Sequence, residues 1–164
     1  MPGNRFDSTD RSILQNLQQH GRMANNELAD IVSLSPSSCL RRTKALEEAG
    51  VISSYRAELD RDLLGLGLTV FISLKVNQHS RERSREIEAA LVAIPAIVAC
   101  HVVAGEADFL VEAAVPNLAV YEQVLLGQIL AIEPITDARS SFAIRTVLSR
   151  GPLPVSQLSG SSAI

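Results

Sequence analysis

The sequence predicts an α+β protein in two parts, and three observations indicate this fold class. Apolar residues recur at helical spacing through the first 50 residues and at the alternating spacing of strands beyond residue 67. Glycine and proline divide the first part into segments of helix length. The chain has 164 residues, 46% of them hydrophobic and 20% charged, which is typical of a globular protein that buries a core.

Three short helices are predicted in the first part. The first follows Asp7 or Ser8, either of which can cap the free amides of the opening turn, and Gly21 is expected to end it. The second is expected to begin at Asn25 as its N-cap. After the third helix, the β-rich residues 51–59 are expected to form a wing or a linker strand.

The third helix is expected to follow Ser35, which is well suited as an N-cap. Pro36 then occupies the first helical position, where its missing N–H removes no hydrogen bond, and Gly50 closes the helix. One face of this helix is expected to be apolar and buried. That predicted stripe consists of Leu40, Ala45 and Leu46.

Two short helices joined by the turn SLSP, the second of them basic on its outer face, form the pattern of a helix-turn-helix. A helix that enters the major groove of DNA needs short donors near its N-terminus and long cations along its exposed side. The residues that meet this need are Ser35, Ser37, Ser38, Arg41, Arg42 and Lys44. The alternative, an ordinary solvated charged helix, is disfavoured by the preceding helices and turn. Double-stranded DNA is therefore the expected partner.

The second part predicts the order β-α-β-β-α-β, which is that of a ferredoxin-like domain. A linker-like stretch, residues 60–67, precedes it. Strands are expected at 68–76, 98–104, 109–115 and 135–147, and helices at 80–93 and 118–130. Residues 105–108, GEAD, are expected to form a tight hairpin turn. Residues 149–164 are rich in Gly, Pro and Ser and are expected to be a loose tail or a crossing arm.

No catalytic, metal or membrane site is expected. The sequence has no Gly-rich phosphate loop, no HExxH motif and no obvious Ser/His/Asp set, and Cys39 and Cys100 fit no metal spacing. No apolar run reaches the ~18 residues of a membrane span. The start MPGNRFDSTD lacks the apolar centre of a signal peptide. We therefore expect a cytoplasmic protein without a resident cofactor.

Several long stretches carry a family resemblance. The segment FDSTDRSILQNLQQHGRMANNELADIVSLSPSSCLRRTKALEEAGVISSYRAELD resembles the N-terminal domain of the Lrp/AsnC (feast/famine) regulators. LGLGLTVFISLKV, CHVVAGEADFLVEAAVPNLAVYEQVL and ITDARSSFAI resemble their second domain, so the resemblance covers roughly residues 6–148. It implies a winged helix-turn-helix joined to a ferredoxin-like (RAM-type) domain. It also implies a homodimer that assembles into tetramers or octamers and binds an amino-acid effector where the hairpin turns of neighbouring dimers meet.

The resemblance further implies an effector site around the GEAD turn. Its residues here are Val102, Gly105, Glu106, Asp108, Leu118, Ser141 and Phe142. Gly105 can take a positive φ and let a ligand approach the backbone, and Asp108 could pair with an ammonium group. The alternative is that Gly105 and Asp108 only shape and cap the turn, and that the apolar members only pack. The chain has Glu106 where the family often has Asp and Phe109 where it often has Tyr, which leaves the effector's identity open.

Two other functions share parts of this pattern. Some relatives with the same two-domain layout are siroheme-type decarboxylases, which need His and Arg to converge on an anionic tetrapyrrole. The second part of this chain is acidic and holds only His79 and His101. An architectural DNA-binding protein would need a large basic excess. Here Lys/Arg and Asp/Glu balance over residues 1–59, and the net charge of −3 arises in the remainder. The sequence therefore favours a sequence-specific transcriptional regulator.

Overall fold

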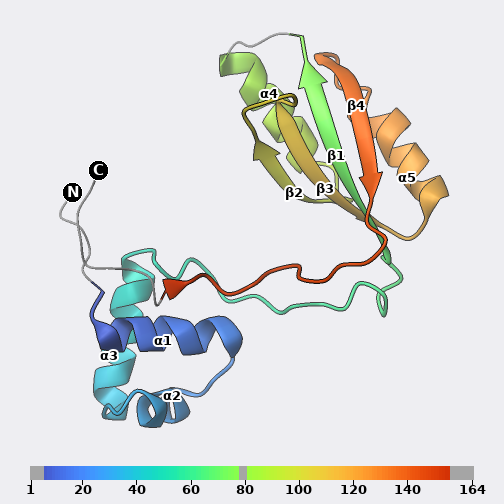
Figure 1. Ribbon diagram of the computed structural model, residues 1–164. Coiled ribbons are helices and arrows are strands. Elements are labelled where there is room, and N and C mark those ends of the chain that lie inside the picture. Colours follow the sequence, from blue (N-terminus) through green and yellow to red (C-terminus); the bar gives the residue numbers. More distant parts are fainter. Residues whose placement is uncertain (1–5, 78–80, 156–164) are drawn as a thin grey trace. The chain divides into compact units, whose positions relative to one another are not determined.

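The computed structural model describes residues 6–77 and 81–155, and the chain divides into two units (Figure 1). The first unit comprises Met1–Glu58 together with Leu148–Ile164, and the second comprises Leu59–Val147. The first unit is therefore discontinuous in sequence. Within the described ranges no helix is long and apolar enough to cross a membrane.

Three helices form the body of the first unit, as the sequence predicts: α1 (Ser8–Gln19), α2 (Asn25–Ile31) and α3 (Pro36–Glu48). They pack around one small apolar core (Figure 1). Its buried members are Ile13, Leu14, Leu28, Ala29, Cys39 and Leu46. With the partly buried Leu17 and Val32, the core residues of each helix recur at spacings of three, four or seven, so each helix contributes one apolar face.

The caps of the three helices agree in part with the sequence predictions. The Asp7 carboxylate accepts a 2.8 Å hydrogen bond from the Asp10 amide, and the Ser35 hydroxyl accepts one of 3.3 Å from the Ser38 amide. The prediction for Asn25 was wrong, because the N-cap of α2 is Ala24 and Asn25 is the first helical residue. Its Nδ2 instead donates to the Pro36 carbonyl over 2.9 Å, which ties α2 to the start of α3. The helix α1 ends where the sequence predicts, with His20 as its C-cap and Gly21 directly after it.

The predicted buried stripe of α3 was largely wrong. Leu46 is buried, but Leu40 is 45% exposed and Ala45 is also exposed. Cys39 is fully buried and stands seven residues before Leu46. Seven residues make about two helical turns, so Cys39 and Leu46 lie on the same face, whereas Leu40 lies about 100° away from Cys39 around the helix. The face that Leu40 occupies is therefore the outer one.

The second unit is a four-stranded antiparallel sheet with order β2-β3-β1-β4. Its elements are β1 (Leu68–Val76), α4 (Arg81–Val92), β2 (Ile97–Val102), β3 (Phe109–Val115), α5 (Leu118–Val124) and β4 (Ile135–Phe142). A π-helical turn, Leu125–Ile129, continues α5. This order is the ferredoxin-like arrangement that the sequence predicts.

Alternate residues of the strands face the two helices. Val70, Ile72 and Leu74 of β1 pack with Ile87 of α4 and Tyr121 of α5 in one core. Side chains on the other face of the sheet include Phe71, Lys75 and Leu110, all exposed. Among the described residues, no helix of the unit covers this second face.

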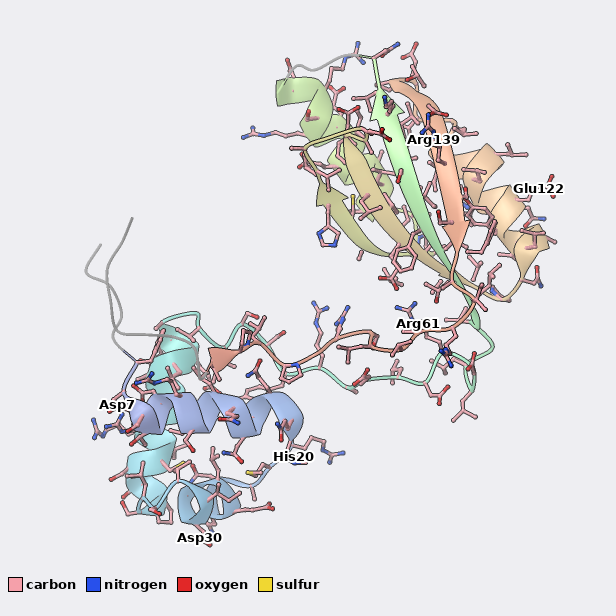
Figure 2. The ribbon with its side chains drawn as sticks, viewed as in Figure 1. Asp7, His20, Asp30, Arg61, Glu122 and Arg139 are labelled. Carbon is pink, nitrogen blue, oxygen red and sulfur yellow. The ribbon has the colours of Figure 1, made fainter. Side chains whose placement is uncertain are left out.

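Several segments differ from their predictions, among them β2, which ends at Val102 instead of Ala104. Residues 51–59 form no strand, and β4 ends at Phe142 instead of extending to residue 147. The expected linker 60–67 contains a turn in which the Asp60 carboxylate accepts a 3.0 Å bond from the Leu63 amide. Arg61 (Figure 2) lies 2.8 Å from the Glu112 carboxylate and donates to the Thr69 hydroxyl over 3.0 Å. This ion pair fixes the turn to the sheet.

The C-terminal segment, residues 148–155, packs with the first unit, which agrees with a crossing arm, one of the two forms expected for the tail (Figure 1). The Gln18 side chain donates to the Leu153 carbonyl over 3.3 Å and accepts from the Leu153 amide over 2.6 Å. Val155 packs against the helical core, and the Ser149 hydroxyl donates to the Glu58 carboxylate over 3.1 Å. An apolar cavity of about 490 Å³ lies between Leu17, Ile52 and Val155. The rest of the predicted tail, 156–164, lies outside the described residues.

Candidate DNA-binding surface and effector site

The outer face of α3 carries an exposed polar and cationic stripe. Ser37, Leu40, Arg41 and Lys44 are all exposed and are separated by one, three or four residues. Residues three and four apart are neighbours on a helix surface, so these side chains form one continuous strip. The buried face of the same helix holds α3 on the core and leaves this strip free to meet a partner.

The three serines at the start of α3 have different roles. The Ser35 hydroxyl accepts from the Ser38 amide and donates to the Ser38 hydroxyl over 2.9 Å, so Ser35 is occupied as the helix cap. Ser38 is half-buried, whereas Ser37 is exposed and lies 3.2 Å from the Ser35 hydroxyl. Of the three, Ser37 is the most accessible to a ligand.

Arg42 points toward α1 and does not belong to the exposed strip. Its Nη1 lies 2.7 Å from Asp10 Oδ1 and 2.8 Å from Asp7 Oδ2, and Figure 2 shows Asp7 at the start of α1. Hydrogen bonds to the Asp10 and Asp7 carboxylates raise the pKa of Arg42. The pKa of Asp7 is lowered, first by the Asp10 amide that it caps and also by Arg42. Arg42 is therefore a brace between α1 and α3.

Helical phase was the signal that could have identified this brace. Arg42 stands three residues after Cys39 and four before Leu46, on the side of α3 that faces the core. The acidic partners are 32 and 35 residues away in sequence, so no local motif joins them to Arg42.

The GEAD turn is exposed at Gly105 and Glu106 and anchored at Asp108. Gly105 has a φ of 141°, a conformation that favours glycine. The Asp108 carboxylate accepts a 2.9 Å bond from the Val76 amide, and the Asp108 amide donates to the Leu74 carbonyl over 2.9 Å. Glu106 is 4.0 Å from Arg139 (Figure 2), with both side chains largely exposed. Asp108 therefore holds the turn against the end of β1.

The predicted effector residues fall into two groups within one chain. Val102 lies near the GEAD turn, since it pairs with Phe109, which in turn pairs with Leu74. Phe142 pairs with Val70, six residues along β1 from Val76. A strand rises about 3.3 Å per residue, so the two groups are ~20 Å apart.

Leu118 and Phe142 belong to the group that lies away from the turn. They are 62% and 46% exposed, and they line an open hollow of about 470 Å³ with Leu68 and Asn117. The Phe142 ring packs edge-on against Tyr121, with centroids 5.5 Å apart, and the Tyr121 hydroxyl is hydrogen bonded to that of Ser140. Ser141 pairs with Phe71 on the other face of the sheet. One copy of the chain therefore does not gather all the predicted effector residues.

Two family models match the chain, one in its N-terminal part and one from β1 to the C-terminal segment. Residues 6–53 match a model described as winged helix-turn-helix DNA-binding. Residues 69–153 match a model described as the Lrp/AsnC ligand binding domain. The chain belongs to the Lrp/AsnC family of transcriptional regulators.

Curated relatives and solved structures agree with this assignment. The chain is 34% identical over 146 residues to the leucine-responsive regulatory proteins of Salmonella typhimurium and Escherichia coli K12, and the match covers 89% of each chain. A transcriptional regulator of Neisseria meningitidis, solved with L-methionine, has a TM-score of 0.89 at 34% identity over 94% of this chain and 99% of its own. An AsnC family regulator of Agrobacterium tumefaciens has a TM-score of 0.87 at 31% identity, covering 93% of this chain and 99% of its own.

Membership of the Lrp/AsnC family decides between the functions that the sequence left open. This protein is a DNA-binding transcriptional regulator and not an enzyme. The decarboxylase and architectural alternatives are set aside.

Proposed function

We propose that this Lrp/AsnC regulator reads its operator with the exposed strip of α3. In this proposal Arg41 contacts a guanine edge or a phosphate, and Lys44 contacts a phosphate. Ser37 and Ser38 contact the phosphates or base edges that approach the start of the helix. The observation that carries the proposal is that Arg41 and Lys44 are exposed on the face of α3 opposite its buried side. Ser35 and Arg42, which the sequence also assigns to DNA contact, act by holding this helix in place.

Replacing Arg41 with alanine is expected to weaken operator binding by about 1–3 kcal/mol, because a bidentate contact to a base is lost. Lys44→Ala is expected to weaken binding to all DNA sequences alike and to reduce the salt dependence of the DNA affinity. Binding is measured by fluorescence anisotropy with specific and random competitor DNA at stated salt. The control is Arg85→Ala, which removes an exposed cation from α4. Unchanged operator affinity in both α3 variants would overturn the proposed surface.

An amino acid is the proposed effector, bound between neighbouring copies of the chain. The separation of the predicted residues within one copy supports this arrangement, since a second copy can bring a Leu118–Phe142 group to a GEAD turn. The relative from Neisseria meningitidis was solved with L-methionine, so methionine is the first probe to use.

Asp108→Asn is expected to weaken methionine binding about tenfold, because a charge-assisted contact to the ammonium group is lost. Asparagine keeps an oxygen that can accept from the Val76 amide, so the turn should stay anchored. Isothermal titration calorimetry measures the affinity, and Glu82→Gln, at an exposed carboxylate of α4 outside the predicted effector site, serves as the matched control. Equal affinity in wild type and Asp108→Asn would assign Asp108 to turn anchoring alone.

We also propose a cytoplasmic homodimer that assembles further into tetramers or octamers. The uncovered sheet face with Phe71 and Leu110 supports the dimer, because such a face is stabilised by a second copy. Light scattering on the calorimetry samples, with and without methionine, gives the mass, and a monomer at micromolar concentration would contradict this assembly.

A further inference from the structure

Leu40 is an apolar side chain within the proposed DNA-binding strip, on the flank nearer the buried face of α3. It is 45% exposed and is not part of the core of the first unit. Its neighbours on the strip are Ser37 one turn before it, Arg41 beside it and Lys44 one turn after it. The fifth residue of α3 thus presents a branched aliphatic group among hydrogen-bonding and cationic groups.

The chemistry of the major groove limits what such a side chain can contact. Leucine has no donor or acceptor, so it cannot bind a phosphate or a polar base edge. Among the four unmodified DNA bases, only thymine presents an apolar group there, its C5-methyl. In a helix-turn-helix, side chains in the N-terminal part of the second helix meet base edges, and Leu40 lies in that part of α3.

We propose that Leu40 determines specificity by packing against a thymine methyl group in each operator half-site. This inference rests on the proposed DNA-binding surface and adds one base preference to it. Arg41 and Lys44 supply charge and hydrogen bonds, and Leu40 selects T·A over C·G at one position through apolar contact.

The test removes the methyl group alone. An operator is first selected from a random DNA pool with the wild-type protein, and each thymine of one half-site is then replaced in turn by deoxyuridine. Affinities of wild type and Leu40→Ala are measured for every such DNA, which makes a double-mutant cycle between the side chain and the methyl. Alanine suits an exposed helical position, so Leu40→Ala should fold, and circular dichroism checks this. Leu126→Ala, at an exposed leucine of the second unit, is the matched control.

One deoxyuridine position is expected to lower the affinity of the wild type and of Leu126→Ala about fourfold, the effect of losing one buried methyl. Leu40→Ala should bind more weakly than wild type and be insensitive to that same substitution. The proposal is overturned if Leu40→Ala responds to every deoxyuridine as wild type does. It is equally overturned if Leu40→Ala changes the mass of the protein assembly and leaves DNA affinity intact, since Leu40 would then contact another copy of the protein.

The two proposals can fail separately. If Arg41→Ala and Lys44→Ala lose operator binding while Leu40 shows no coupling to any methyl group, the surface stands and the thymine contact falls. If none of the three variants changes operator binding, both proposals fall.

Discussion

Arg42→Ala is expected to lower the free energy of unfolding of the first unit by about 1–2 kcal/mol, after allowance for solvent screening of a partly exposed cluster. The substitution removes two ion pairs, of 2.7 and 2.8 Å, and leaves Asp7 and Asp10 without their shared cation. Because Arg42 braces α3 against α1, the DNA-binding helix should also lose its fixed orientation. Thermal unfolding followed by circular dichroism measures the stability, and anisotropy measures operator binding.

Arg41→Ala is the matched comparison, since it removes the neighbouring cation of the same helix. It should retain wild-type stability and lose DNA affinity, whereas Arg42→Ala should lose both. If Arg42→Ala unfolded at the wild-type temperature and still failed to bind DNA, Arg42 would be a direct DNA contact and the brace would have little energetic weight.

The stability difference between wild type and Arg42→Ala should depend on pH through the pKa of Asp7. The folded protein holds that pKa below its ordinary value of 3.8, first through the Asp10 amide and also through Arg42. A depressed folded pKa stabilises the protein above the unfolded pKa, and this contribution is lost as the pH falls through the folded value. The stability difference between wild type and Arg42→Ala should therefore be full at neutral pH and shrink below about pH 4.

Removing residues 151–164 is expected to destabilise the first unit by about 2 kcal/mol, since the chain then loses two hydrogen bonds and a packed apolar side chain. Those groups are the Leu153 amide and carbonyl, both bonded to Gln18, and the Val155 side chain. A chain that ends after Val155 keeps all of them and is the matched comparison, expected to melt at a higher temperature than the shorter chain. Equal melting of the two truncated chains would show that the segment contributes nothing to the unit.

A second measurement follows the same contact in the full-length protein. Gln18→Ala should increase the rate of tryptic cleavage after Arg150 about fivefold, since cleavage tracks the population in which the segment has opened. Gln19→Ala, at the next exposed position of α1, should leave the rate unchanged.

Features that depend on nearby residues could be predicted from the sequence. Asp7 and Ser35 cap their helices as expected, because a cap requires only a side-chain oxygen and an amide within three residues. The order of strands and helices in the second unit followed from the alternation of apolar residues. The predicted N-cap at Asn25 was wrong because the Asn25 carboxamide donates a hydrogen bond to Pro36 of another helix.

Features that depend on packing between elements could not be predicted. Leu40 was expected on the buried stripe with Ala45 and Leu46, yet the orientation of α3 on the core leaves Leu40 45% exposed and buries Cys39. Arg42 looked like Arg41 in the sequence, and only the approach of Asp7 and Asp10 distinguishes them. Likewise, the separation of Phe142 from the GEAD turn is set by the register in which β4 pairs with β1. That register could not be predicted from the sequence.

The hydrogen bond between Ser149 and Glu58 has a consequence for engineering this regulator. It brings together the two points at which the first unit is interrupted, so the second unit, Leu59–Val147, is an insertion between neighbouring points of the first unit. A fragment that stops at residue 58 is thus an incomplete DNA-binding domain. A short loop that joins residue 58 to residue 148 should close at little entropic cost and keep the C-terminal segment in the unit. The second unit can then be removed, or replaced by another domain whose ends lie close together.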